Sequence, residues 1–266
     1  MSQAHPVRTI FDVDNCDYII TEIYNAIKSK NLKELKVLSE THDLTHYVNL
    51  QDETEMTLLH WAIYKGDLEI LTWLSKTYDL SPSVDLTDEC GMTPLHIVLY
   101  EEDSEMVKWF FETYDLIKCI NLPDANGMTP LHLATRYISL EIITLFSETY
   151  DLSPSVNYSE GGGMTPLYWV VDRGDLEIIK WLSKTYDLSH SVNLQDDNGY
   201  TPLHLAIYNQ DLEIIKYLSE TYDLSHSVNL QDINGRTPLH LAVKRNNLEI
   251  VKFLLEKYSM TSTQNN

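Results

Sequence analysis

Cysteine is scarce in this sequence of 266 residues, which contains only Cys16, Cys90 and Cys119. The number is odd, the spacings are wide, and no two cysteines form a Cys-x-x-Cys pair. This pattern argues against both a disulfide framework and a zinc knuckle. We therefore expect free thiols in a reducing compartment.

Basic residues are also few. Lys and Arg number 19 against 40 Asp and Glu, which gives a formal net charge of −21 at pH 7. Such a surface repels phosphate backbones and anionic lipid, so we expect neither nucleic acid nor a membrane surface as a partner. A partly basic protein or peptide is a better candidate.

Long apolar runs and a leader pattern are missing as well. No run approaches the ~20 residues of a membrane span. Residues 1–14 lack a basic stretch followed by an apolar one, which is the pattern of a Sec-type signal peptide. With 43% hydrophobic and 22% charged residues, the chain can bury a continuous core. We expect a cytoplasmic protein; the alternative is delivery into the cytosol of a host cell.

What the sequence does contain is an internal repeat, held in register for seven copies that lie 36 residues apart. Each copy is marked by a threonine, most often followed by proline, leucine and histidine in succession. A register of this length does not arise by chance. The recurring residues are Thr21, Thr57, Thr93, Thr129, Thr165, Thr201 and Thr237; Pro94, Pro130, Pro166, Pro202 and Pro238; Leu59, Leu95, Leu131, Leu167, Leu203 and Leu239; and His60, His96, His132, His204 and His240.

Each copy predicts two short helices. In the sixth copy, the hydroxyl of Thr201 can cap a helix that has Pro202 at its first position. Apolar residues then follow at helical spacing. Asp211 can cap a second helix, and Asn234 with Gly235 indicates a tight turn before the next copy. The predicted unit is helix, turn, helix, loop and hairpin.

One such unit cannot bury its own apolar face, whereas stacked neighbours can, and the terminal copies then need a polar outer side. We expect an N-terminal extension over 1–17, a repeat domain over 18–258 with repeats starting near 21, 57, 93, 129, 165, 201 and 237, and a tail over 259–266. The first and last copies carry basic residues that we interpret as parts of polar caps: Lys28, Lys30, Lys33 and Lys36, and Lys244, Arg245, Lys252 and Lys257.

The motif Thr-Pro-Leu-His-Leu-Ala at 201–206 resembles the ankyrin repeat, as do the segments 211–215 and 196–199. The resemblance covers roughly residues 18–258. It implies an all-α, ankyrin-type repeat solenoid of helix-turn-helix units with hairpin-like loops, in seven repeats of 36 residues.

The sequence departs from the family pattern at three places. The usual ankyrin repeat has 33 residues; here three more follow the second helix, as in 185–192, where we expect a slightly longer helix and a larger outer loop. Glu55 stands where a turn glycine is usual. Tyr168 replaces the histidine that would tie the fifth repeat to its neighbour, after three glycines at 161–163. We predict that this glycine tip is the most deformable one, with faster amide exchange than the tips at Gly127 and Gly199.

Catalytic chemistry is not indicated. The histidines recur once per repeat, too far apart to share a metal at ~2 Å, and the resemblance implies that they join neighbouring loops by hydrogen bonds. The glycines at 161–163 lack the phosphate-loop pattern. The acidic residues at 101–103 form a solvated cluster without a visible nucleophile. We expect no enzyme, no cofactor and no metal; an enzyme would require a site that the fold hides.

The resemblance implies binding through the concave side, made of the hairpin tips and the exposed face of each first helix. Residues at these places vary from copy to copy, whereas the core positions barely change. Tyr and Met suit interfaces, although mutual packing as hairpin filler is an equal alternative for the methionines. The predicted partner-binding residues are Tyr64, Met92, Tyr100, Glu101, Glu102, Met128, Arg136, Tyr137, Met164, Arg173, Tyr200 and Tyr208.

The predicted function is protein–protein interaction. We expect a monomer that acts as an adaptor, inhibitor or sequestering protein for a partly basic protein partner. One alternative is an effector of an intracellular microbe that binds a host protein; another is a structural spacer. A third is a substrate of an asparagine hydroxylase, which in similar repeats modifies the loop position held here by Asn49, Asn121, Asn157, Asn193 and Asn229.

Overall fold

The computed structural model describes residues 13–258, with side chains from residue 18 onward. The chain divides into two compact units, Met1–Glu89 and Cys90–Asn266, which are described separately. Every regular element within 13–258 is helical, and these residues form fifteen α-helices and four 3₁₀-helices. The predicted all-α fold of paired helices is thus confirmed. The predicted tail, 259–266, and residues 1–12 of the predicted extension lie outside the described residues.

The first unit holds two helix pairs. Helix α1 (Val13–Lys28) packs against α2 (Leu32–Thr41) and against α3 (Leu58–Tyr64), and α3 packs against α4 (Leu68–Thr77). The 3₁₀-helices η1 (Leu44–His46) and η2 (Ser81–Ser83) follow the second helix of each pair.

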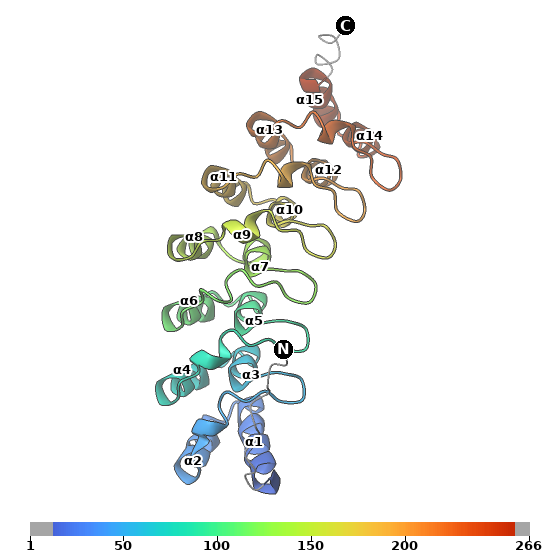
Figure 1. Ribbon diagram of the computed structural model, residues 1–266. Helices are drawn as coiled ribbons and strands as arrows, with labels where there is room; N and C mark the ends of the chain where they lie inside the picture. The colour runs from blue at the N-terminus through green and yellow to red at the C-terminus, as the bar shows by residue number, and fades with distance from the viewer. Residues whose placement is uncertain (1–12, 259–266) are drawn as a thin grey trace, which may run out of the picture. The chain divides into compact units, whose positions relative to one another are not determined.

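The second unit holds five helix pairs in a row (Figure 1). The first helices of successive pairs pack on one another in chain order, and each is followed by the second helix of its pair. The pairs are α5 (Pro94–Tyr100) with α6 (Ser104–Thr113), α7 (Pro130–Tyr137) with α8 (Leu140–Thr149), α10 (Pro166–Arg173) with α11 (Leu176–Thr185), α12 (Pro202–Tyr208) with α13 (Leu212–Thr221), and α14 (Pro238–Lys244) with α15 (Leu248–Tyr258); the short helices are α9 (Ser153–Val156), η3 (Ser191–Asn193) and η4 (Ser227–Asn229).

The helix starts follow from the repeated residues. Thr201 Oγ1 accepts the backbone N–H of His204, and Nδ1 of His204 accepts the N–H of Thr201, so the two residues cap α12 reciprocally. Pro202 occupies the first helical position, where a missing N–H has no cost. Asp211 Oδ1 accepts the N–H of Ile214 at 3.0 Å and caps α13. These local bonds confirm the predicted helix-turn-helix unit.

The three additional residues per repeat do not lengthen the second helix, contrary to our expectation. Helix α11 ends at Thr185, and Tyr186 is extended, with φ −133° and ψ 157°. Its ring packs edge-on against Trp181 at a centroid distance of 5.9 Å. This packing holds the ring against the helix while the backbone leaves it.

The additional residues form an outer loop that binds the preceding repeat. Asn157 Nδ2 donates to the carbonyl of Asp187 at 2.9 Å, and the hydroxyl of Ser191 donates to Oδ1 of Asn157. We name this pair of bonds the loop latch. The same latch joins Asn121 to the carbonyl of Asp151 and to Ser155, and the first unit has one at Asn49.

The two terminal repeats differ in their outer sides. In the first repeat, polar residues such as Thr21, Asn25 and Lys33 are exposed, as a cap requires. In the last repeat, Val243 and Leu248 are exposed, so the predicted polar cap at the C-terminal end is wrong. The basic residues that suggested it, Lys244, Lys252 and Lys257, are exposed as well, but they do not cover Val243 and Leu248.

Candidate functional site

The predicted partner-binding residues fall into two sets. The helix column lies at the last turn of each first helix and just after it, and the hairpin column lies at the end of each hairpin-like loop. The helix column consists of Tyr64, Tyr100, Glu101, Glu102, Arg136, Tyr137, Arg173 and Tyr208, and the hairpin column of Met92, Met128, Met164 and Tyr200.

In the second unit, the structure brings helix-column residues of two repeats into contact with each other and with Trp169 of a third. The rings of Tyr100 and Tyr137 lie 5.5 Å apart between centroids. The guanidinium carbon of Arg136 lies 4.9 Å from the ring centroid of Tyr137 and 4.0 Å from that of Trp169. We call these four residues the central cluster. Tyr100 is 55% exposed, whereas burial raises the pKa of Tyr137.

Trp169 was missed by reasoning from sequence. It occupies the fourth position of α10, where the other repeats of this unit carry Ile97, Leu133, Leu205 and Leu241. A tryptophan at an otherwise aliphatic position was the available signal. Its indole N–H is buried and has no hydrogen-bond partner among the described residues.

The acidic residues beside the central cluster divide into two roles. Asp103 Oδ1 accepts the backbone N–H groups of Glu105 and Met106 and caps α6. Glu101 and Glu102 are exposed, and Glu102 has a φ of 58°. Only Glu101 and Glu102 therefore present carboxylates that are free of a capping role.

Arg173 has contacts within the unit. Its Nη1 donates to the carbonyl of Ile138 at 2.7 Å, and its Nη2 lies 3.6 Å from Asp175 Oδ2. These contacts join the end of α10 to the end of α7, so the guanidinium contributes to the packing of neighbouring repeats.

The hairpin methionines are half-buried, and their backbones are held in place. Asp124 Oδ1 accepts the N–H of Met128 at 2.8 Å, and Glu160 Oε1 accepts the N–H of Met164 at 3.1 Å. A carboxylate at the start of each of these loops thus folds the loop back on itself.

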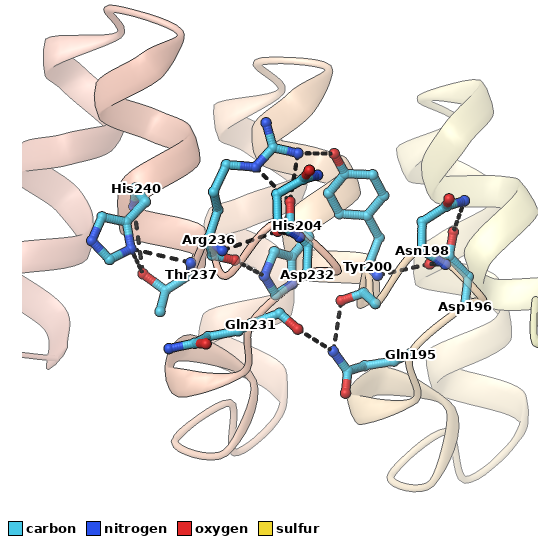
Figure 2. Close-up of polar contacts among 12 residues, drawn as sticks. Gln195, Asp196, Asn198, Tyr200, His204, Gln231, Asp232, Arg236, Thr237 and His240 are labelled. Carbon is cyan, nitrogen blue, oxygen red and sulfur yellow. Dashed lines mark hydrogen bonds and ion pairs between the residues drawn. The ribbon is translucent and has the colours of Figure 1, made fainter.

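A second cluster lies near the end of the unit (Figure 2). Arg236 Nε donates to Asp232 at 2.6 Å, and its Nη2 donates to the hydroxyl of Tyr200 at 3.0 Å. Burial opposes ionisation of Asp232, but the bonds from Arg236 and from Asn234 outweigh it and hold the pKa of Asp232 at about 2. The side chain of Tyr200 is therefore positioned by an ion pair whose carboxylate is buried and whose guanidinium is half-buried.

Tyr208 completes this end of the helix column. Its ring centroid lies 6.3 Å from that of Tyr200, and the guanidinium carbon of Arg245 lies 3.7 Å from it. Arg236 and Arg245 were not among the predicted binding residues. Each is the basic residue of an aromatic contact, a signal that becomes visible only when the repeats are stacked.

The first unit has its own aromatic group. Trp61 and Tyr64 lie 6.0 Å apart between centroids, and Lys28 Nζ lies 4.0 Å above the ring of Trp61. Lys65 Nζ lies 5.2 Å from the ring centroid of Tyr64. The indole N–H of Trp61 donates to Asp52 Oδ2 at 2.7 Å.

The histidines have the structural role that the resemblance implied. Nδ1 of His96 accepts the N–H of Thr93, and its Nε2 donates to the carbonyl of Met128 in the next hairpin at 3.1 Å. Nε2 of His132 donates to the carbonyl of Tyr158, six residues before the equivalent of Met128, at 3.0 Å, and burial lowers the pKa of His132 to about 4. Both ring nitrogens are occupied, which leaves neither for catalysis.

Tyr168 replaces the histidine without losing the link. Its hydroxyl donates to Asp196 Oδ2 in the next hairpin at 2.8 Å, and burial raises its pKa. The carbonyl of Gly162 in the glycine tip accepts the N–H of Asp197 at 2.9 Å. The assumption that this repeat lacks its link to the next one is thus wrong, while the faster amide exchange at 161–163 stays a prediction.

Residues 13–258 contain neither a metal-binding group nor a membrane-spanning helix. No group of three or more His, Cys, Asp or Glu side chains there is arranged to hold a metal ion. No helix there has the length and hydropathy needed to cross a membrane.

Comparison with known families gives a consistent result. A family model described as ankyrin repeats (3 copies) matches residues 77–157, 113–191, 145–232 and 167–265. A second, described as ankyrin repeats (many copies), matches residues 23–74. No curated protein sequence matches the chain. The family matches span nearly all of the described helix pairs, and the chain therefore belongs to the ankyrin repeat family.

Proposed function

We propose that this chain is an adaptor, inhibitor or sequestering protein that binds a partly basic protein partner through its helix and hairpin columns, on the predicted concave side. Ankyrin repeats indicate a protein–protein interaction module. The observation that carries the finer proposal is the central cluster, in which aromatic and basic side chains from α5, α7 and α10 meet at one place on the surface.

The central cluster has the character of a binding hot spot. Interface energy concentrates in a few aromatic and arginine residues. The rings of Tyr100 and Tyr137 support each other, and Arg136 lies against both Tyr137 and Trp169, so little side-chain freedom remains to be lost on binding. Glu101 and Glu102 lie beside these rings and favour a partner with basic residues.

Catalysis is not part of the proposal. Ankyrin repeat proteins are generally non-enzymatic binding modules. His96 and His132, which could otherwise act as general bases, are buried and engaged in bonds between hairpins. Any activity of a complex would then come from the partner. We further propose that the chain is a cytoplasmic monomer.

Affinity capture with the full chain tests the proposal. The bait is compared with a variant that carries Tyr100→Ala and Tyr137→Ala. Because ~1.4 kcal/mol is a factor of ten in affinity and one hot-spot residue contributes ~2 kcal/mol, we expect binding to weaken more than tenfold. Glu101→Gln with Glu102→Gln should mainly slow association and flatten its salt dependence.

A matched control changes two exposed side chains of the outer loops, His190→Ala and His226→Ala, and should leave the affinity unchanged. Circular dichroism must show equal helix content in all variants. Loss of binding in the histidine variant together with normal binding in the tyrosine variant would assign the partner to the outer loops and refute the proposed surface.

The effector alternative uses the same surface and differs in the cell that contains the partner, so a translocation assay separates it from an endogenous adaptor. The hydroxylase alternative must account for the loop latch. The amides of Asn49, Asn121 and Asn157 are bonded to a neighbouring repeat, and modification would require the loop to open. An intact-mass shift of ~16 Da per site would reveal it.

A further inference from the structure

The last repeat presents the residues that internal repeats use for stacking. Val243 is 61% exposed, whereas its equivalent one repeat earlier, Ile207, is 0% exposed. Val251 is half-buried where Ile215 is fully buried, and Leu255 is exposed where Ser219 is buried. Leu248, at the start of α15, is 70% exposed. We call this apolar outer side of α14 and α15 the end face.

The end face also carries the polar groups that join one repeat to the next. Inside the unit, Nε2 of His204 donates to the carbonyl of Arg236 at 3.4 Å, and the carbonyl of Asn198 accepts the N–H of Ile233 at 3.0 Å. The equivalent groups of the last repeat are Nε2 of His240 and the carbonyl of Asn234. Neither has a hydrogen-bond partner within residues 13–258.

The loop latch is incomplete in the same way. Asn193 donates to the carbonyl of Asp223 and accepts a hydrogen bond from the hydroxyl of Ser227, both in the following repeat. Asn229, its equivalent, donates instead to the carbonyl of Ser225 in its own loop at 3.1 Å. Apolar, hairpin and latch groups of the last repeat are thus arranged as for a following repeat.

We propose that the end face is a docking surface for an ankyrin-type repeat of another protein, which stacks on α14 and α15 in the register of the internal repeats. Helices α14 and α15 expose three lysines, Lys244, Lys252 and Lys257, against two glutamates, Glu249 and Glu256. This excess of positive charge favours a partner with acidic residues around its first repeat.

A second copy of this chain does not supply the matching surface through its first repeat. The positions that form a hairpin in later repeats lie inside the continuous helix α1. Tyr47 stands at the latch position that Ser83, Ser155 and Ser191 hold elsewhere. The occupant must instead begin with a complete hairpin and a loop that contains the latch serine.

A probe can be made from the chain itself. In the probe, residues 1–50 are replaced by a copy of residues 195–230, which places a hairpin and a latch serine in the first repeat. The substitutions Val243→Lys and Leu248→Gln block the end face of the probe and prevent it from polymerising. Circular dichroism establishes that the probe is folded before use.

We expect the native chain and the probe to form a 1:1 complex in sedimentation velocity and calorimetry. Val243→Lys with Leu248→Gln in the native chain should weaken the complex at least tenfold. Ile117→Lys, at an equally exposed apolar residue of an outer loop, should leave it unchanged. So should Tyr100→Ala with Tyr137→Ala, because this proposal does not depend on the helix column.

Two outcomes would overturn the proposal: a folded probe that does not associate, and native chain that self-associates through Val243, which would assign the end face to a second copy. If the probe does not fold, an extension in cis replaces it. A copy of residues 223–258 inserted after Tyr258 should slow thiol labelling of Val243→Cys, in a Cys90→Ser background, at least tenfold. Unchanged labelling would equally refute docking of a repeat.

Discussion

Trp61 in the first unit and Trp169 in the second occupy the same position of their repeats. Each is covered by a basic side chain from the preceding repeat, Lys28 or Arg136, at 4.0 Å from the ring centroid. Their indole N–H groups differ: that of Trp61 donates to Asp52, whereas that of Trp169 has no partner in the described chain.

The residue at the start of the hairpin explains the difference. Asp52 uses Oδ1 for the backbone of its own loop and Oδ2 for Trp61. The equivalent residue in the fifth repeat is Glu160, whose Oε1 accepts the N–H groups of Gly162 and Met164. The longer side chain folds the loop but does not bond the indole. A surface aromatic can thus be fixed completely or left with one unused donor by a single methylene.

Among these tests, acid should have the largest effect, because it should destabilise the surroundings of Trp169 more than those of Trp61. Burial lowers the pKa of His132 from 6.5 to about 4, so the fold favours its neutral form. The corresponding stability is complete above pH 6.5 and is lost as the pH falls from 6.5 to about 4. At 1.36 kcal/mol per unit, the loss is about 3 kcal/mol.

Because His132 bonds to the loop that leads to Glu160, amide exchange should rise in residues 158–163 over this pH range before it rises in residues 52–56. Hydrogen exchange with mass spectrometry measures both segments in one sample, and the His132→Gln variant provides the control. Simultaneous opening of both segments would show that His132 is not the group that responds.

Replacing each tryptophan with phenylalanine tests how much the indole N–H contributes to stability. The expected effect is smaller than that of acid. Trp61→Phe removes a hydrogen bond to a carboxylate, whereas Trp169→Phe removes a buried donor that has no partner. A hydrogen bond to a charged group contributes about 1.5–3 kcal/mol, so Trp61→Phe should be the more destabilising by about that amount. Urea unfolding of the two variants gives the comparison, and equal losses would contradict it.

Shortening Glu160 to aspartate should give the indole of Trp169 the hydrogen bond that Trp61 has. In Glu160→Asp, one oxygen can serve the loop and the other can accept the indole N–H, as in Asp52. The expected gain in unfolding free energy is about 1 kcal/mol. Glu160→Gln, which keeps the length, should show no gain. A loss of stability in the aspartate variant would indicate that the glycine loop requires the longer side chain.

Much of the fold could be predicted from sequence because its causes are local. Thr201 and Asp211 start their helices through bonds to residues three positions ahead, and such spacings are visible in the sequence. The resemblance carried by the Thr-Pro-Leu-His motif implied bonds between neighbouring loops, and His96, His132 and His204 make them.

The contacts that shape the candidate site could not be predicted in the same way. Arg136 reaches Trp169 and Tyr168 reaches Asp196 across neighbouring repeats, and such pairs depend on side-chain length and stacking. The prediction of a polar cap at the C-terminal end was wrong for a related reason. The sequence of α15 shows its lysines. It does not show whether another repeat covers Val243 of α14 and Leu255 of α15, which the structure leaves exposed.

The loop latch has a consequence for how such a chain can change in length. Where the latch is present, as at Asn157, the asparagine bonds a serine and a carbonyl of the following repeat, so half of the latch is encoded in one repeat and half in the next. Duplication or loss of a whole 36-residue segment keeps the asparagine and serine positions in register; at one junction Asp85 and Cys119 stand at these positions instead. Loss of three residues from one outer loop, which would return that repeat to the ordinary ankyrin length, removes a latch instead. Recombination is thus tolerated in whole repeats and opposed in fractions of one, which gives a physical reason for a period of 36 residues kept without slippage.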